Sequence, residues 1–285
     1  MKPYLIGIYE KAMPNFLSWR EKMEIAKEAG YDYIEISIDE TDEKLARLDW
    51  TKKERDEFVQ LMKEMDMPVR SMCLSGHRKY PFGSLNEETR RRSNEIMDKA
   101  LAFSDDLGIR IIQLAGYDVY YEESNDETKR LFEENLRRAA IGAAKYGIQM
   151  GFETMENEFM NTVEKAMKYV KLVDSPYLHV YPDLGNITNA TKTYGTTIEA
   201  DLETGRGRII AMHLKETVPG VFREVPYGTG HVDFNAGIRK AFSLGVRRFV
   251  TEFWYTGEEN WKEIIMDVNK MMREKLDEEI KAFEK

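Results

Sequence analysis

Eight short apolar runs alternate along this chain with longer segments whose apolar residues recur at helical spacing. No other sequence feature limits the fold as strongly. We interpret as strands the runs at residues 4–10, 31–38, 68–74, 109–116, 148–155, 178–183, 209–216 and 247–254. Helical patterns cover residues 17–30, 51–66, 88–108 and 127–147, and lie near 160–173, 197–204, 234–244 and 258–283. This repeat predicts an α/β protein with the architecture of a (β/α)₈ TIM barrel.

The same alternation would also suit a doubly wound open sheet, so the two folds have to be distinguished. A dinucleotide-binding sheet of that kind carries a Gly-rich phosphate loop after its first strand, and this chain has none there. We also find no Pro/Gly/Ser-rich linker and no low-complexity segment. We therefore predict a single barrel domain over residues 1–285.

Composition limits the kinds of partner and the cellular compartment that we expect for this protein. Lys and Arg total 42 against 51 Asp and Glu, a net charge of −9 that disfavours nucleic acid or a membrane surface as partner. The single cysteine, Cys73, excludes an intramolecular disulfide and is predicted to be a small core residue. The chain has no membrane-span-length apolar run and no signal peptide at its start, so we expect a cytoplasmic protein.

Four consecutive predicted strands carry a metal-competent side chain near their carboxyl ends, where barrel enzymes place their chemistry. These residues are Glu153, Asp183, His213 and Glu252, separated by 30, 30 and 39 residues. In each strand, side-chain alternation puts the candidate on the face that points into the barrel. In the last run, Phe249, Thr251 and Phe253 would then face the helices.

Three carboxylates and one imidazole suit one divalent cation, Zn²⁺ or Mn²⁺, with Mg²⁺ or Co²⁺ as further candidates. Without a cation the carboxylates would repel one another and their pKa values would rise. The alternative is that each carboxylate forms its own buried pair with a Lys or Arg. We favour the metal site because all four side chains occur at successive strand ends.

Other polar residues have both a functional and a structural interpretation. Glu35 and Gln113 point inward and could line a pocket or hydrogen-bond inside the barrel. The loop at residues 75–84 gathers His77, Arg78 and Lys79, either as an anion clamp over the barrel mouth or as a solvated basic loop. Two further histidines are not assigned to the site: we expect His179 in the core and His231 in an exposed loop.

Several stretches resemble one enzyme family: GIYEKAMP, DETDEKLARLDW, SMCLSGHRKYPFGS, GIRIIQLAGYDVYY, YPDLGN, HLKETVPGVF and VPYGTG followed by VDF. They extend almost from end to end, and they resemble the L-ribulose-5-phosphate 3-epimerase (L-xylulose-5-phosphate 3-epimerase) family of xylose isomerase-like barrels. The resemblance implies that Glu153, Asp183, His213 and Glu252 hold the metal. It also implies that the two glutamates are the catalytic acid and base, and that the protein is a homodimer.

The resemblance further implies an isomerase that interconverts L-xylulose 5-phosphate and L-ribulose 5-phosphate through a metal-stabilised enediolate, without an organic cofactor. The substrate would be a small sugar phosphate. Related 3-epimerases of free ketohexoses tend to carry a histidine where this chain has Asn186 and an arginine where it has Pro219. These departures count against a free-sugar substrate and leave room for a phosphate.

Because the chain is acidic, local cations and backbone amides must hold the phosphate. The predicted substrate contacts, chosen by their position near strand ends, are Asn186, Lys215, His77, Arg78, Lys79, Lys11 and Arg223. Three alternative functions remain at this stage: a 3-epimerase of unphosphorylated ketoses, an aldose–ketose isomerase, and a non-catalytic metal- and sugar-binding barrel. A metal-dependent endonuclease is disfavoured by the acidic charge and by only four histidines.

Overall fold

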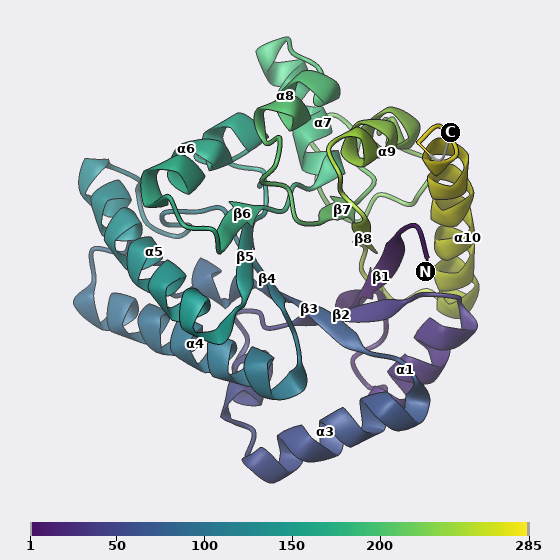
Figure 1. The fold of residues 1–285 in the computed structure, drawn as a ribbon, viewed down its shortest axis with the longest axis horizontal. Coiled ribbons are helices and arrows are strands. Elements are labelled where there is room, and N and C mark those ends of the chain that lie inside the picture. The colour runs from purple at the N-terminus through teal and green to yellow at the C-terminus, as the bar shows by residue number, and fades with distance from the viewer. Residues whose placement is uncertain (1, 284–285) are drawn as a thin grey trace.

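Eight parallel strands form one sheet in the computed structural model, which describes residues 2–283. The strands are β1 (Leu5–Tyr9), β2 (Tyr33–Ser37), β3 (Val69–Leu74), β4 (Ile111–Leu114), β5 (Gln149–Phe152), β6 (Leu178–Val180), β7 (Met212–Leu214) and β8 (Arg248–Thr251). Figure 1 shows them in the centre of the molecule, surrounded by the helices. The predicted (β/α)₈ barrel is therefore confirmed.

Of the ten α-helices in the described residues, eight begin and end close to their predicted bounds, and those at residues 42–46 and 184–194 were not predicted. The ten helices are α1 (Trp19–Glu28), α2 (Asp42–Ala46), α3 (Lys52–Met65), α4 (Glu87–Leu107), α5 (Asp126–Tyr146), α6 (Val163–Val173), α7 (Leu184–Tyr194), α8 (Ile198–Thr204), α9 (Phe234–Ser243) and α10 (Trp261–Ile280). Short 3₁₀ helices η1 (Glu10–Ala12), η2 (Arg47–Asp49) and η3 (Ser75–Arg78) lie in the loops. Gly108 and Gly147 end α4 and α5 in the left-handed conformation, as the sequence predicts.

The barrel closes between β6 and β7, which are the two ends of the strand order β6-β5-β4-β3-β2-β1-β8-β7. Single parallel bridges join Val180 to Ile209 and Asp183 to His213 across this seam. The second bridge connects two of the predicted metal ligands through their backbones. Closure of the barrel and assembly of the site therefore depend on the same contact.

Strand side chains divide into an inner and an outer set. Phe249, Met150 and Phe152 belong to the large core between sheet and helices, whereas Tyr181 and Val250 belong to a small cluster inside the barrel. This division confirms the predicted alternation for β5, β6 and β8. Two large inner tyrosines fit because a glycine lies opposite each one.

Gly7 and Gly151 provide that space. A Cβ on Gly7 would lie 2.5 Å from the ring of Tyr33, and a Cβ on Gly151 would lie 2.9 Å from the Cβ of Tyr181. Because any larger residue would collide there, the two glycines allow both tyrosines to fill the barrel below the site.

Two sequence interpretations differ from the structure. The predicted helices do not include the segment containing Asn186 and Asn189, but it forms α7, which Asp183 caps by accepting a hydrogen bond from the Asn186 backbone N–H. In addition, the alternation that points His213 inward predicts the same direction for Ile209, four residues earlier, but this prediction is wrong: Ile209 packs on the outer core and Ile210 on the inner cluster. Ile209 and Ile210 precede the regular strand, and strict alternation does not apply to them.

Within residues 2–283, we find no helix with the length and apolar character that a bilayer crossing requires.

Candidate active site and metal centre

The four predicted ligands lie at the carboxyl ends of four neighbouring strands. Glu153 follows β5 directly and Glu252 follows β8 directly, and their backbone N–H groups donate to the carbonyls of Leu114 and Leu214, at 2.8 and 3.0 Å. His213 lies within β7, and Asp183 caps α7 just after β6. The strand ladder and the helix cap thus fix the backbone of every member.

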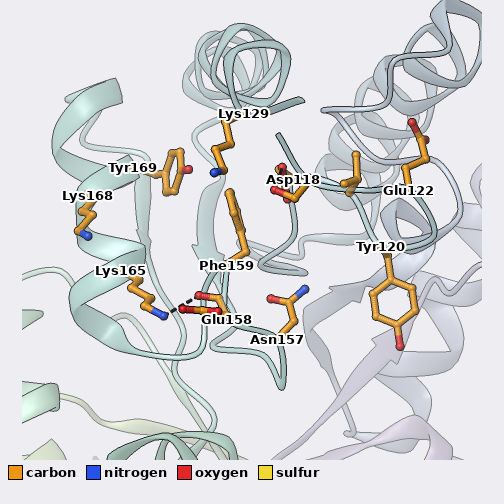
Figure 2. Close-up of a pocket in the computed structure, with 12 residues that line it drawn as sticks. Asp118, Tyr120, Glu122, Lys129, Asn157, Glu158, Phe159, Lys165, Lys168 and Tyr169 are labelled. Atoms are coloured by element: carbon orange, nitrogen blue, oxygen red, sulfur yellow. Dashed lines mark hydrogen bonds between the residues drawn. The ribbon is translucent and has the colours of Figure 1, made fainter. Parts of the chain in front are cut away.

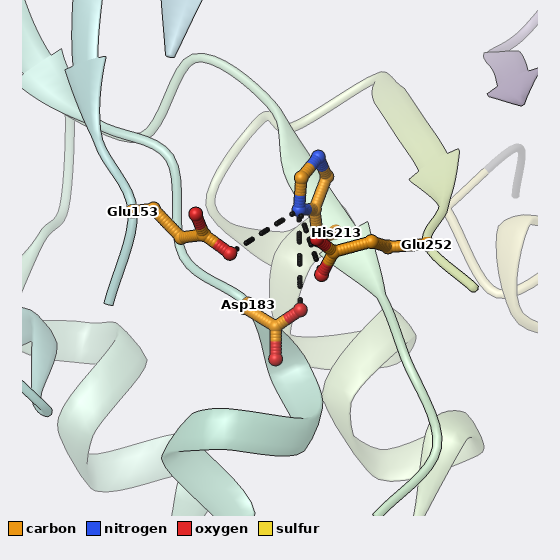
Figure 3. A group of neighbouring side chains, drawn as sticks. All are labelled: Glu153, Asp183, His213 and Glu252. Carbon is orange, nitrogen blue, oxygen red and sulfur yellow. Dashed lines mark ion pairs between the residues drawn. The ribbon is translucent and has the colours of Figure 1, made fainter. Parts of the chain in front are cut away.

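These four side chains, which we call the carboxylate cluster, converge in space. One potential ligand atom from each residue lies within 4.8 Å of all the others. The distances from His213 Nδ1 are 3.3 Å to Glu252 Oε2, 3.6 Å to Glu153 Oε1 and 3.9 Å to Asp183 Oδ2 (Figure 3). Side-chain exposure is at most 6% for any member. The four residues that the sequence placed at successive strand ends therefore lie together in the structure.

The opposite edge of the His213 ring is held by a buried carboxylate. Nε2 lies 2.6 Å from Glu35 Oε1, while Glu35 Oε2 accepts hydrogen bonds from Ser71 Oγ at 2.7 Å and from the Tyr181 hydroxyl at 2.9 Å. An acceptor at Nε2 favours the proton on that nitrogen and leaves Nδ1 with a lone pair that can bind a metal ion or accept a hydrogen bond. The Gln113 amide nitrogen lies 3.2 Å from Nδ1. Glu35 and Gln113 thus make the hydrogen bonds inside the barrel that were one of their two interpretations.

Charge is unevenly balanced within the cluster. Burial and the neighbouring charge of Glu252 raise the pKa of Glu153. Burial would also raise the pKa of Glu252, but Lys215 and His213 beside it hold that pKa well below its ordinary value. Burial raises the pKa of Asp183, and Lys215 only partly offsets this effect. Glu153 and Asp183 therefore have too little positive charge beside them to offset their burial, whereas Glu252 does not lack it.

Unpartnered oxygens show what the cluster can bind. Asp183 Oδ2 and Glu252 Oε2 are buried and accept no hydrogen bond from the described residues, although the Lys215 ammonium lies 3.3 Å from each. Buried acceptors are normally satisfied, so two orphans that face one point indicate a missing ligand. Three carboxylates and an imidazole nitrogen fit a divalent metal ion at that point.

A pocket opens above the cluster and contains most of the predicted substrate contacts. Five of the seven line it, together with Glu153 and Glu252: Asn186, Lys215, Arg78, Lys11 and Arg223. The other two do not. His77 is buried, with Nε2 3.2 Å from the Ser93 carbonyl and its ring 4.4 Å from that of Phe82, and Lys79 is exposed beside Tyr80.

The loop at residues 75–84 therefore sends its three basic residues in different directions rather than forming one clamp. Arg78 alone turns toward the pocket, with its guanidinium 4.9 Å from the ring centre of Tyr120 and 5.9 Å from that of Tyr117. The 3₁₀ helix η3 produces this divergence, because successive residues of a tight helix point about 120° apart.

Sequence reasoning did not identify several pocket residues. Tyr9, Ser75, Met155, Glu156, Phe222 and Trp254 also line the pocket. Tyr9 and Trp254 follow the inward alternation of β1 and β8, so that pattern was a usable signal for them. Phe222 and Glu156 lie on loops, whose paths depend on contacts distant in sequence.

A second pocket lies between the loops after β4 and β5 and helices α5 and α6 (Figure 2). Its lining includes Asp118, Lys129, Phe159, Lys165 and Tyr169. No member of the carboxylate cluster lines this pocket, so it is separate from the candidate active site.

Known proteins resemble this chain over most of its length. Residues 23–275 match the family model described as xylose isomerase-like TIM barrel. The chain is 43% identical over 275 residues to the putative L-ribulose-5-phosphate 3-epimerase SgbU of Escherichia coli K12, covering 94% of each chain. It is 44% identical over 229 residues to the L-ribulose-5-phosphate 3-epimerase UlaE of Escherichia coli O139:H28, covering 80% of this chain and 79% of UlaE.

Solved structures support the fold. The D-allulose 3-epimerase from Methylomonas sp., solved in complex with D-allulose, superposes with a TM-score of 0.79 at 17% identity, over 96% of this chain and 98% of that one. The sequence matches carry the assignment further than this structural likeness does. The chain belongs to the L-ribulose-5-phosphate 3-epimerase family of xylose isomerase-like TIM barrels, and it is an isomerase.

Proposed function

We propose that this protein interconverts L-ribulose 5-phosphate and L-xylulose 5-phosphate by epimerisation at carbon 3, with a divalent metal ion and no organic cofactor. The names of the two E. coli relatives include the first of these sugars. The observation that carries the proposal is the pair of buried glutamates in Figure 3, where Glu153 and Glu252 approach the His213 ring from opposite sides.

Two facing carboxylates suit this reaction because the hydrogen on carbon 3 must leave one face and return to the other. One glutamate, as carboxylate, accepts the carbon 3 proton, and the electron pair moves toward the carbon 2 carbonyl oxygen to give an enediolate. The other glutamate, as carboxylic acid, donates its proton to the opposite face of carbon 3 while the carbonyl re-forms. Glu153 and Glu252 come from separate strands and can therefore serve the two faces.

Glu153, Asp183, His213 and Glu252 would hold the metal ion, which we expect to be Zn²⁺ or Mn²⁺, with Mg²⁺ or Co²⁺ as substitutes. When bound, the ion supplies positive charge that stabilises the negative charge developing on the substrate oxygens.

The rim of the pocket supports a phosphorylated substrate. Lys11, Arg78 and Arg223 line it and carry the charge that would attract a phosphate. Arg223 also lies over the Trp254 ring, with 5.8 Å from the guanidinium to the ring centre. Deeper in the pocket, the buried Asn186 Oδ1 accepts no hydrogen bond from the described residues and would suit a sugar hydroxyl.

The proposal also places the reaction in the cytoplasm, where phosphorylated sugars are retained, and includes the homodimer that the family resemblance implies.

Hydrogen exchange tests this function directly. The protein, loaded with Mn²⁺, is incubated in D₂O with L-ribulose 5-phosphate or with unphosphorylated L-ribulose, and the recovered sugars are examined by NMR. We expect deuterium at carbon 3, much faster exchange with the phosphorylated sugar, and loss of exchange after treatment with EDTA.

Each alternative function gives a different result in the same experiment. Faster exchange with free L-ribulose would indicate a 3-epimerase of unphosphorylated ketoses. Formation of an aldose would indicate an aldose–ketose isomerase. Binding of the sugar without any exchange would leave a non-catalytic barrel and would refute the proposed function.

A further inference from the structure

Lys215 places a buried positive charge against the carboxylate cluster. Its ammonium lies 3.3 Å from Asp183 Oδ2 and 3.3 Å from Glu252 Oε2. These are the oxygens by which the two residues approach His213 Nδ1, and they accept no hydrogen bond from the described residues. The lysine therefore faces the atoms that a metal ion would need.

The position of this lysine follows from the strand. Lys215 comes two residues after His213 at the end of β7, so its side chain leaves the strand on the same face. The side chain is 5% exposed, and the ammonium also lies 5.9 Å from the Trp254 ring centre. In the described part of the chain, Asp183 and Glu252 are its only carboxylate partners within 4 Å. A buried ammonium is costly without such partners, so this arrangement ties the lysine to the cluster.

Charge counting shows the consequence. Glu153, Asp183 and Glu252 contribute −3 when ionised, and Lys215 contributes +1. A divalent ion would bring the local sum to zero. With all three carboxylates ionised and His213 neutral, the sum is −2 without an ion and −3 without the lysine as well.

We propose that Lys215 is an internal competitor of the metal ion. It stabilises the metal-free protein by partly neutralising Asp183 and Glu252, and it weakens divalent-cation binding by placing a like charge beside the ion. The inference rests on the proposed metal site and adds to it a residue that sets how readily the ion is exchanged.

Lys11 provides a matched comparison. It lines the same pocket and carries the same charge, but its ammonium pairs with Asp39 Oδ2 at 2.5 Å and, among the described residues, forms no ion pair with a member of the carboxylate cluster. A general loss of positive charge from the pocket would therefore be reproduced by K11M, whereas a specific effect on the metal ligands would appear only when Lys215 is replaced.

The test measures metal affinity and metal-free stability rather than turnover. Wild type, K215M, K215Q and K11M are stripped of metal, and Mn²⁺ is titrated by calorimetry at a temperature where circular dichroism shows each protein folded. Thermal unfolding is followed in EDTA. We expect Mn²⁺ to bind K215M and K215Q at least about tenfold more tightly than wild type, since a neighbouring like charge is removed. We also expect both variants to unfold at a lower temperature in EDTA, with K11M near wild type in both measurements.

Different results separate the inference from the proposed function. If wild type takes up no Mn²⁺, the metal site itself is wrong. If wild type binds Mn²⁺ while K215M and K215Q bind it equally or more weakly, Lys215 positions the ligands instead of competing with the ion, and the inference is refuted. If K11M matches the Lys215 variants, the effect is nonspecific and the inference fails as well.

Discussion

Two groups of buried charges lie at the carboxyl ends of the barrel strands, and they differ in how their oxygens are satisfied. The Glu10 cluster consists of Glu10 with Lys22, Lys44 and Arg47. Both of its carboxylate oxygens are fully engaged, with Oε1 at 2.6 Å from Lys44 Nζ and Oε2 at 2.6 Å from Arg47 Nη1. The carboxylate cluster instead keeps two orphan oxygens. Burial of charge is common to both, so only the unpartnered acceptors mark a ligand site.

Side-chain direction explains the difference. Glu10 directly follows β1, as Glu252 directly follows β8. Tyr9 is the last residue of β1 and points into the barrel, so the next residue, Glu10, points outward toward the helices. There it forms ion pairs with the three cations. Thr251 ends β8, and because its neighbour Val250 points inward, Glu252 points inward too. If either glutamate were moved by one residue along its strand, its side chain would point to the other face of the sheet and its role would change between structural and chemical.

The largest effect should follow from neutralising the inward carboxylates. We expect E153Q and E252Q each to lower turnover of L-ribulose 5-phosphate by about 10³- to 10⁴-fold, because an amide neither accepts nor donates the carbon 3 proton. Steady-state kinetics with saturating Mn²⁺ measures this loss, and circular dichroism checks the fold. Glu158, exposed on the loop after β5, offers a control, since E158Q should keep turnover within about twofold. Near-normal turnover in either cluster variant would refute the two-glutamate mechanism.

Replacement of Glu10, the outward carboxylate, should instead lower the stability of the protein and leave metal binding intact. E10Q leaves three buried cations without their counter-ion, and we expect it to lower the free energy of unfolding by about 3–5 kcal/mol. Urea denaturation measures the loss. E64Q removes an exposed partner of Arg20 and should cost no more than about 1 kcal/mol. If E10Q proved as stable as E64Q, or if it abolished Mn²⁺ binding, the division of roles between the two clusters would not hold.

The comparison also shows how far the sequence could predict this site. Alternation along a strand is a local property, so Glu153, Asp183, His213 and Glu252 could be placed on one face without knowing the fold. The same reasoning found Glu35 and Gln113, because a polar residue on an inward face needs a partner. Although these side chains are far apart in sequence, the regular geometry of a closed barrel brings neighbouring strand ends together.

The sequence patterns did not predict the loops and irregular segments correctly, and the reasons are physical. Helix α7 is rich in Thr, Asn and Gly, which have low helix propensity, and it forms because Asp183 caps it and its apolar residues are buried. Ile209 precedes the regular strand, so period-two alternation gives the wrong face. His77 looked like part of a basic loop, yet it lies against Phe82 because η3 turns it inward. Such contacts are set by tertiary structure and leave little trace in one sequence.

His77 is a buried titratable group that stays neutral, unlike the members of the two charged clusters. Replacing it should have the smallest effect of the substitutions considered, controls aside. Burial lowers its pKa to about 4, and the hydrogen bond to the Ser93 carbonyl only partly offsets this. In the unfolded chain the imidazole takes up a proton near its ordinary pKa of 6.5, whereas the folded protein resists protonation until about pH 4. Its contribution to stability is therefore complete above pH 6.5 and is lost as the pH falls from 6.5 toward 4.

When the pH is lowered from 7 to 5, the free energy of unfolding of wild type should fall by about 2 kcal/mol more than that of H77Q, because only wild type contains this histidine. Urea denaturation of both proteins at the two pH values isolates the term, because titration of the two clusters is common to both. H231Q serves as the control, since His231 is partly exposed and should change the pH dependence far less. An identical pH dependence in wild type and H77Q would mean that His77 can be protonated in the folded protein. In that case the loop would be open enough for this residue to join Arg78 as an anion contact, and His77 would belong with the substrate-facing charges rather than with the structural ones.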